Sequence, residues 1–178
     1  MKKLTYDGEL LDYVNQFMHI AGYLKEKSGP ILWQLPPSLK MDIPKLEKFC
    51  TLLSYDFQHV FEFSDVSCFI PEVYDVLEKY RHSLCIVSDP GKIPEVIKAT
   101  SKTAYVRFHG ITSWYKDNYS HEALKSWKHE LELLPAQRLY VFFNNDTNAF
   151  AVNNGLYLTS LFGTAPLKRS DSKQMVLF

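Results

Sequence analysis

The chain has 178 residues, with 20 basic and 20 acidic side chains and a formal net charge of zero at pH 7. This length suits one domain. The balanced charge lacks the basic excess of proteins that grip many phosphates, which argues against an extended nucleic-acid surface. The apolar runs are too short for a membrane-spanning helix of roughly 20 residues, and the amino-terminal residues lack a secretory signal pattern. We therefore expect a cytoplasmic protein without a membrane partner.

The cysteines Cys50, Cys68 and Cys85 are odd in number and form no C-x-x-C pair. This pattern argues against both a disulfide framework and a zinc site. We expect three buried thiols.

The chain begins with a helical pattern and then alternates between strand and helix patterns. Apolar residues spaced by three and four predict an amphipathic helix over about residues 9–25. A short apolar run over 31–35 predicts a buried strand, which Pro36 ends. Asp42 and Pro44 are typical of a helix start and precede a second apolar stripe.

The same alternation continues to about residue 162. Apolar runs predict further strands at 60–63, 84–87, 104–108 and 139–143. Pro71 and Ser120 begin predicted helices, and a last helix covers 151–162, although Asn154 and Gly155 weaken its continuity. Buried strands separated by helices predict βα units and a parallel sheet.

Polar side chains follow each predicted strand, at the edge where parallel α/β folds hold their chemistry. If the sheet curls into a barrel, these side chains converge on one mouth: Gln34, Glu62, Asp89, Arg107, His109, Asn144, Asn145 and Asp146. Strand-end Asp89 and Asn145 also have a simpler interpretation, in which they cap the following loop. The aromatic residues Trp114, Tyr115 and Tyr119 follow His109 and Gly110, and they either form a wall of the mouth or pack at its rim.

Arg107 lies among apolar residues, and its charge needs a partner, for which Glu62 is the natural choice. One interpretation is a purely structural ion pair. The other is that Arg107 and His109 bind an anion while Glu62 or Asp89 acts as a base or metal ligand. Both remain open, and a divalent metal is a possible cofactor of the second.

The strand-end phrases together resemble the YecE-like family, a TIM-barrel domain of unknown function. The phrases that carry the resemblance run in order from residue 29 to residue 146: Gly29–Pro37, Phe61–Phe63 with Ser67, Tyr105–Gly110, Tyr115–Ser120 and Tyr140–Asp146. The resemblance implies a (β/α) barrel whose mouth carries the polar residues, and it supplies no reaction.

Two departures from the family pattern matter. Ser64–Asp65 and Cys68 stand where such proteins usually have Arg-His and Trp, which puts in doubt any activity that needs those residues. The first barrel strands of the family are absent. A TIM barrel typically takes about 250 residues, so we expect residues 1–163 to form a partial TIM-type α/β barrel of about five parallel strands. An upstream polypeptide or a second copy would complete it.

Residues 164–178 are predicted to be a flexible tail with an apolar end. The end resembles the short peptides that bind DNA sliding clamps, with Gln174 at a pocket rim and Met175, Leu177 and Phe178 in apolar holes. The alternative is that these residues dock on the surface of the barrel itself.

Three hypotheses follow. The chain is a hydrolase or phosphodiesterase, with Glu62, Asp89, His109 and Asp146 catalytic and Gln34, Arg107, Tyr115, Asn144 and Asn145 binding an anionic substrate. It is an accessory protein that a sliding clamp recruits to DNA, which is compatible with the first hypothesis. Otherwise it is a non-catalytic truncated barrel that acts as a binding module or survives as a remnant.

Overall fold

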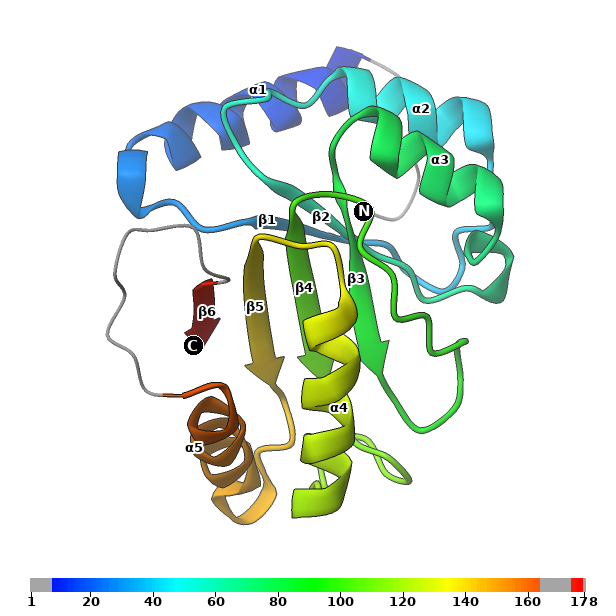
Figure 1. Cartoon of the computed structure of the whole chain (residues 1–178). Helices are drawn as coiled ribbons and strands as arrows, with labels where there is room; N and C mark the ends of the chain where they lie inside the picture. Colours follow the sequence, from blue (N-terminus) through cyan, green and yellow to red (C-terminus); the bar gives the residue numbers. More distant parts are fainter. Residues whose placement is uncertain (1–7, 164–173, 178) are drawn as a thin grey trace.

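Six parallel strands form one sheet in the described part of the chain, residues 8–163 and 174–177 of a computed structural model (Figure 1). Strand order in the sheet follows chain order from β1 to β6. The strands are β1 Ile31–Gln34, β2 His59–Glu62, β3 Ser83–Ser88, β4 Thr103–Phe108, β5 Arg138–Phe143 and β6 Gln174–Leu177. The five strands expected from the sequence are all present.

The helices are α1 Gly8–Gly22, α2 Ile43–Thr51, α3 Pro71–Lys79, α4 His121–Leu133 and α5 Phe150–Phe162. Short 3-10 helices lie at η1 Lys25–Lys27, η2 Val66–Cys68 and η3 Thr147–Ala149. The predicted caps are confirmed, because the side chains of Asp42 and Ser120 accept hydrogen bonds from the backbone N–H groups of Lys45 and Ala123. None of the described helices is long and apolar enough to cross a bilayer.

Helices cover one face of the sheet in two groups. Figure 1 shows α1, α2 and α3 grouped over one half and α4 and α5 over the other. A first core joins the first group to β2 and β3 through fully buried side chains such as Phe49, Phe61 and Leu77. A second core joins the other group to β4 and β5 through Val106 and Leu124 among others. Burial of this kind contributes about 1.5–3 kcal/mol for each large apolar side chain.

The opposite face of the sheet has a core made of strand side chains and one loop residue. The residues of this smaller cluster are Val60, Cys85, Val87 and Tyr105, with Leu32, Ile93, Tyr140 and Phe142 packed against them. Side chains alternate along a strand, so Gln34, Glu62 and Arg107 share this face and lie beyond the apolar cluster, toward the carboxyl ends. Here the sheet presents an apolar floor with a polar layer above it.

Two local features bear on expectations from the sequence, and the first differs from them. Helix α5 runs through Asn154 and Gly155 without interruption. A Cβ at Gly155 would lie 3.7 Å from the ring of Phe143, which is an ordinary packing distance. The three cysteines are free and buried, as expected.

The carboxyl-terminal residues Gln174–Leu177 form β6, which pairs in parallel with β5 from Arg138 to Val141. This arrangement corresponds to the alternative in which the end of the chain docks on the barrel itself. Without β6, the backbone N–H and C=O groups along that side of β5 would be unpaired. Residues 164–173 of the predicted tail and Phe178 lie outside the described residues.

Candidate functional site

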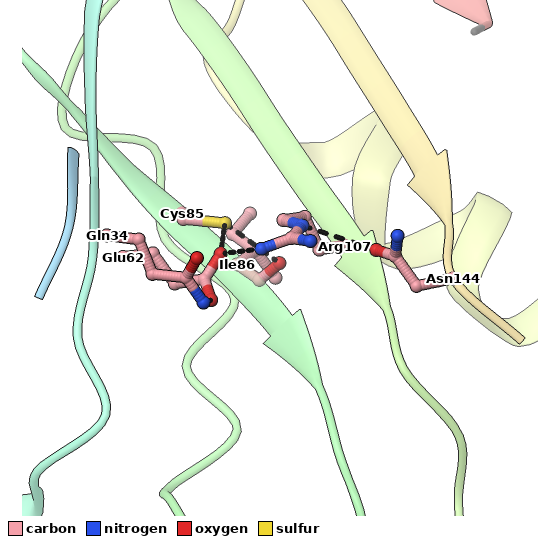
Figure 2. Close-up of polar contacts among 6 residues, drawn as sticks. All are labelled: Gln34, Glu62, Cys85, Ile86, Arg107 and Asn144. Carbon is pink, nitrogen blue, oxygen red and sulfur yellow. Dashed lines mark hydrogen bonds and ion pairs between the residues drawn. The ribbon is translucent and has the colours of Figure 1, made fainter. Parts of the chain in front are cut away.

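Four polar side chains form a row on the sheet face opposite the helices, near the carboxyl ends of the strands (Figure 2). The Arg107 guanidinium donates to Glu62 through Nη1 (2.7 Å to Oε2) and to Asn144 through Nε (3.2 Å to Oδ1). The other oxygen of Glu62 accepts a hydrogen bond from Gln34 Nε2 at 2.9 Å. The row therefore links β1, β2, β4 and the end of β5, and it confirms that Glu62 is the partner of Arg107.

The Glu62–Arg107 pair is withdrawn from water. The side chain of Glu62 is 5% exposed and that of Arg107 is 16% exposed. The Cys85 thiol donates to Glu62 Oε2 from 3.6 Å, and burial raises the pKa of this thiol well above its usual value, so the thiol stays protonated. Removal of one member would leave the other as an uncompensated buried charge.

Arg107 retains unused hydrogen-bonding capacity. Its bonds to Glu62 and Asn144 use Nη1 and Nε, while Nη2 has no hydrogen-bond partner among the described residues. A guanidinium can donate from both ends of its fork. The same side chain can therefore hold the pair and receive an oxyanion.

His109 lies two residues beyond Arg107 on the same face and is 2% exposed. Burial lowers its pKa below the ordinary 6.5, and the neighbouring Arg107 charge lowers it further, while Glu62 and Asp89 act in the opposite direction. The imidazole is therefore neutral at pH 7. Its backbone N–H donates to the Ser88 carbonyl oxygen at 2.9 Å, which fixes it against the end of β3.

Asp89 begins the loop after β3 and has two different carboxylate oxygens. Oδ1 accepts from the backbone N–H groups of Gly91 (2.9 Å) and Lys92 (3.2 Å), which is the loop-capping role expected from the sequence. Oδ2 is buried and has no hydrogen-bond partner among the described residues. One oxygen holds the loop, and the other remains available to a ligand.

The loop that follows His109 is organised by Gly110 and Asp117. Gly110 has φ +132°, and a Cβ there would overlap the Ser113 carbonyl oxygen, so only glycine fits. The Asp117 carboxylate accepts backbone N–H groups from Ile111 (2.7 Å), Thr112 and Ser113 (2.8 Å), which lowers its pKa to about 2. The loop is thereby folded around one carboxylate.

Two aromatic residues of this loop stand beside His109. The Trp114 ring lies 5.2 Å from the imidazole and the Tyr115 ring 5.6 Å from it, measured between centroids. Tyr115 has φ +65° and a half-exposed side chain. This left-handed conformation is held because its N–H donates to the His109 carbonyl oxygen at 2.6 Å.

A comparison with family models identifies the chain. The model described as "Protein of unknown function DUF72" matches residues 2–175. The chain belongs to the DUF72 family. The YecE-like resemblance is therefore confirmed, and a search of curated proteins gives no match.

Solved DUF72 structures share the fold. A protein from Enterococcus faecalis superposes with a TM-score of 0.79 at 17% identity, over 94% of this chain and 72% of its own. A second structure of an E. faecalis DUF72 protein gives 0.73 at 18% identity, over 91% and 75%. One from Thermotoga maritima gives 0.75 at 26% identity, over 85% and 65%. This DUF72 chain thus spans about two thirds to three quarters of the length of these structures, and it shares their TIM-barrel-like α/β fold.

The structure brings most of the predicted site residues together. Gln34, Glu62, Arg107 and Asn144 form the row, and His109 and Tyr115 are in ring contact beyond it. Asn145 is fully buried and bonds to the Asp117 carbonyl oxygen (2.8 Å) and to Asn154 (2.7 Å), so it supports the loop. Asp146 is exposed and precedes η3.

Two residues at or behind the mouth, Lys92 and Asp117, were not among the predicted site residues, whereas Trp114 was a candidate wall of the mouth. Trp114 lies against His109, and Lys92 Nζ lies over the Trp114 ring, 5.4 Å from its centroid. Asp117 shapes the loop from behind. The dense run of Gly, Ser, Thr and Asp over residues 110–117 is the signal for a structured turn that would have pointed to Asp117.

Proposed function

We propose that the carboxyl-end mouth binds a small phosphate-bearing or otherwise anionic molecule and hydrolyses its ester. The observation that carries the proposal is the juxtaposition of Arg107, with its Nη2 group left over, and the neutral, buried imidazole of His109. Arg107 would bind the anion through a charge-assisted hydrogen bond. His109 would accept a proton from the attacking water.

The other members of the row hold Arg107 in place. Both oxygens of Glu62 already accept hydrogen bonds, from Gln34 and Arg107, so we propose that Glu62 positions the guanidinium and does not itself take a proton. Asn144 fixes the guanidinium from its other side. This removes Glu62 from the predicted acid–base residues and leaves Asp89, His109 and Asp146.

No step of the proposed hydrolysis is assigned to a metal ion. Within residues 8–163 and 174–177, no three His, Cys, Asp or Glu side chains cluster in a way that could hold a metal. Water attacks the phosphorus, the bond to the leaving alcohol breaks, His109 accepts the proton of the water, and solvent protonates the alcohol. Arg107 stabilises the charge on the phosphoryl oxygens.

A screen of phosphomonoesters and phosphodiesters tests the proposal. We expect His109→Gln to reduce turnover by about 100-fold or more, as loss of a general base does, and Arg107→Lys to raise KM. Lys128→Ala, which removes an ion pair with Glu132 within α4, is the matched control. Because His109 acts in its neutral form, turnover should be level between pH 6.5 and 8 and fall only below pH 6.5. Turnover that survives His109→Gln would contradict the assignment.

The non-catalytic alternative has one observation in its favour, because hydrogen bonds already join Glu62, Arg107, Gln34 and Asn144 without a ligand. The same screen separates the two functions. Saturable binding of phosphate compounds without turnover would favour a binding module, and turnover would favour the hydrolase.

Recruitment by a sliding clamp is also part of the proposed function, on the sequence of Gln174–Phe178 alone. As β6, Gln174–Leu177 forms the edge of the described sheet and pairs only with β5 there. Capture by a clamp would therefore have to compete with this pairing. Leu177→Ala with Phe178→Ala should abolish a pull-down with the clamp, and unchanged recovery would exclude recruitment.

A further inference from the structure

Three polar atoms at the mouth are buried and have no hydrogen-bond partner in the described part of the chain. They are Asp89 Oδ2, His109 Nδ1 and Trp114 Nε1. Each buried polar atom left without a partner costs about 1–3 kcal/mol, and native structures leave few of them. Three such atoms on neighbouring residues call for a common explanation.

The three residues lie on adjoining segments that follow β3 and β4. Asp89 ends β3, His109 ends the adjacent strand β4, and Trp114 comes back from the following loop to lie against the His109 ring. The two strand ends are joined by the backbone, because the His109 N–H donates to the carbonyl oxygen of Ser88, the residue before Asp89. Lys92, whose N–H is held by Asp89, lies over the Trp114 ring and joins the two loops.

We propose that Asp89, His109 and Trp114 form a subsite for the hydroxyl groups of a sugar, and that the substrate class of the mouth is a sugar phosphate. The phosphate half rests on the proposed function, in which Arg107 holds the anion. The sugar half rests on the three unpartnered atoms.

Hydroxyl groups match these atoms better than other polar groups. A hydroxyl both donates and accepts, so one can donate to Asp89 Oδ2 and accept from Trp114 Nε1. A second hydroxyl can pair with His109 Nδ1 in either tautomer of the ring. A cation fits poorly, because the indole N–H is a donor only and would point its positive end at the ion.

Tyr115 supplies a wall for the ring of the sugar. Its backbone is held on both sides, because its N–H donates to His109 and its carbonyl oxygen accepts from Thr147 Oγ1 at 3.1 Å. The half-exposed ring lies 5.6 Å from that of Trp114. An aromatic face next to polar atoms suits a ligand with one apolar side and one hydroxylated edge.

Calorimetric titration of the full chain with four probes tests the proposal: inorganic phosphate, ribose, ribose 5-phosphate and glucose 6-phosphate. We expect at least one sugar phosphate to bind about tenfold or more tightly than phosphate. Trp114→Phe keeps the ring and removes the donor, and Asp89→Asn removes the carboxylate. Each should remove most of this advantage. Trp114→Phe, which changes no charge, should also leave the affinity for inorganic phosphate unchanged, with Lys128→Ala as control.

A second readout is specific to Trp114. Its indole N–H signal, assigned as the one missing from the ¹⁵N spectrum of Trp114→Phe, should move when the sugar phosphate binds and stay in place with phosphate alone. Should Trp114→Phe fail to fold, the three indole N–H signals of the parent protein still decide the question, because at least one of them should move with the sugar phosphate and not with phosphate alone.

The outcomes separate the two halves. Equal affinity for phosphate and both sugar phosphates, with the Trp114 signal unmoved, would overturn the sugar subsite and leave the anion site intact. A second outcome is that sugars bind and move the Trp114 signal, while neither a phosphate group nor Arg107→Lys changes their affinity. This result would support the sugar subsite and contradict the anion site. No binding of any probe would overturn both.

Discussion

The buried His82 should make the protein lose stability in mild acid. Its ring is 2% exposed and packs between Phe61 and Tyr80, with His59 edge-on at 5.2 Å. Burial, and then the proximity of His59, lowers the pKa of His82 from 6.5 to about 4. The folded protein therefore resists protonation over a range in which the unfolded chain takes up a proton.

The sign and size of the effect follow from this difference. Above pH 6.5 neither state is protonated at His82 and its ionisation has no influence. As the pH falls from 6.5 to about 4, the unfolded state gains the proton first, and the free energy of unfolding decreases. At about 1.4 kcal/mol per pKa unit, the total loss from this one side chain approaches about 3 kcal/mol.

Urea unfolding followed by circular dichroism between pH 4 and 8 measures this loss. His82→Phe keeps a stacking ring without a titrating group, so its free energy of unfolding should fall by about 3 kcal/mol less over the same range. His129→Gln, on an exposed position of α4, should behave like the parent. Identical slopes for the parent and His82→Phe, or an NMR titration of the folded protein that places the His82 pKa near 6.5, would refute the reasoning.

Three further substitutions test other parts of the structure by urea unfolding. Gly110→Ala combines φ +132° with a clash against the Ser113 carbonyl and should lower the free energy of unfolding by about 2 kcal/mol or more; a neutral result would mean that the loop is held differently. Arg107→Ala leaves Glu62 buried without its partner and should cost about 3 kcal/mol, whereas the double change Arg107→Met with Glu62→Leu should be nearly neutral; equal losses would contradict a buried pair. Ser120→Ala removes the α4 cap and should cost about 1 kcal/mol, with Ser126→Ala as the control inside the same helix.

The strands and the ion pair could be predicted from the sequence because both depend on simple periods. Apolar runs of strand length located the five predicted strands, β1 to β5. The alternation of side chains along a strand placed Arg107 on the face that Glu62 also occupies. Asp42 and Ser120 indicated where their helices begin. This signal is local, because the capping side chain bonds to a backbone N–H only three residues later. Such features need no knowledge of distant parts of the chain.

The rest of the mouth was harder to predict because it depends on loop geometry. Trp114 returns to His109 only because Gly110 takes a positive φ and Asp117 gathers the backbone between them. A positive φ at Gly110 and at Tyr115 cannot be read from hydrophobic periodicity. The pairing of Gln174–Leu177 with β5 is likewise a long-range choice between a free tail and an open strand edge.

The arrangement of apolar and polar layers bears on how the mouth can bind an anion. Tyr105 and Phe142 stack at 4.7 Å beneath the polar row, so the Glu62–Arg107 pair has an apolar floor on one side. Low polarity there strengthens the pair, and an anion that displaced Glu62 from Arg107 would leave a buried carboxylate unpaired, at a cost of about 3–5 kcal/mol. An anion should therefore add to the pair through Nη2 without opening it. In that case Glu62→Gln, which keeps a hydrogen-bond acceptor for Arg107 and removes the negative charge, should tighten phosphate binding; a variant that binds phosphate more weakly would show that Glu62 holds Arg107 by charge and not by position.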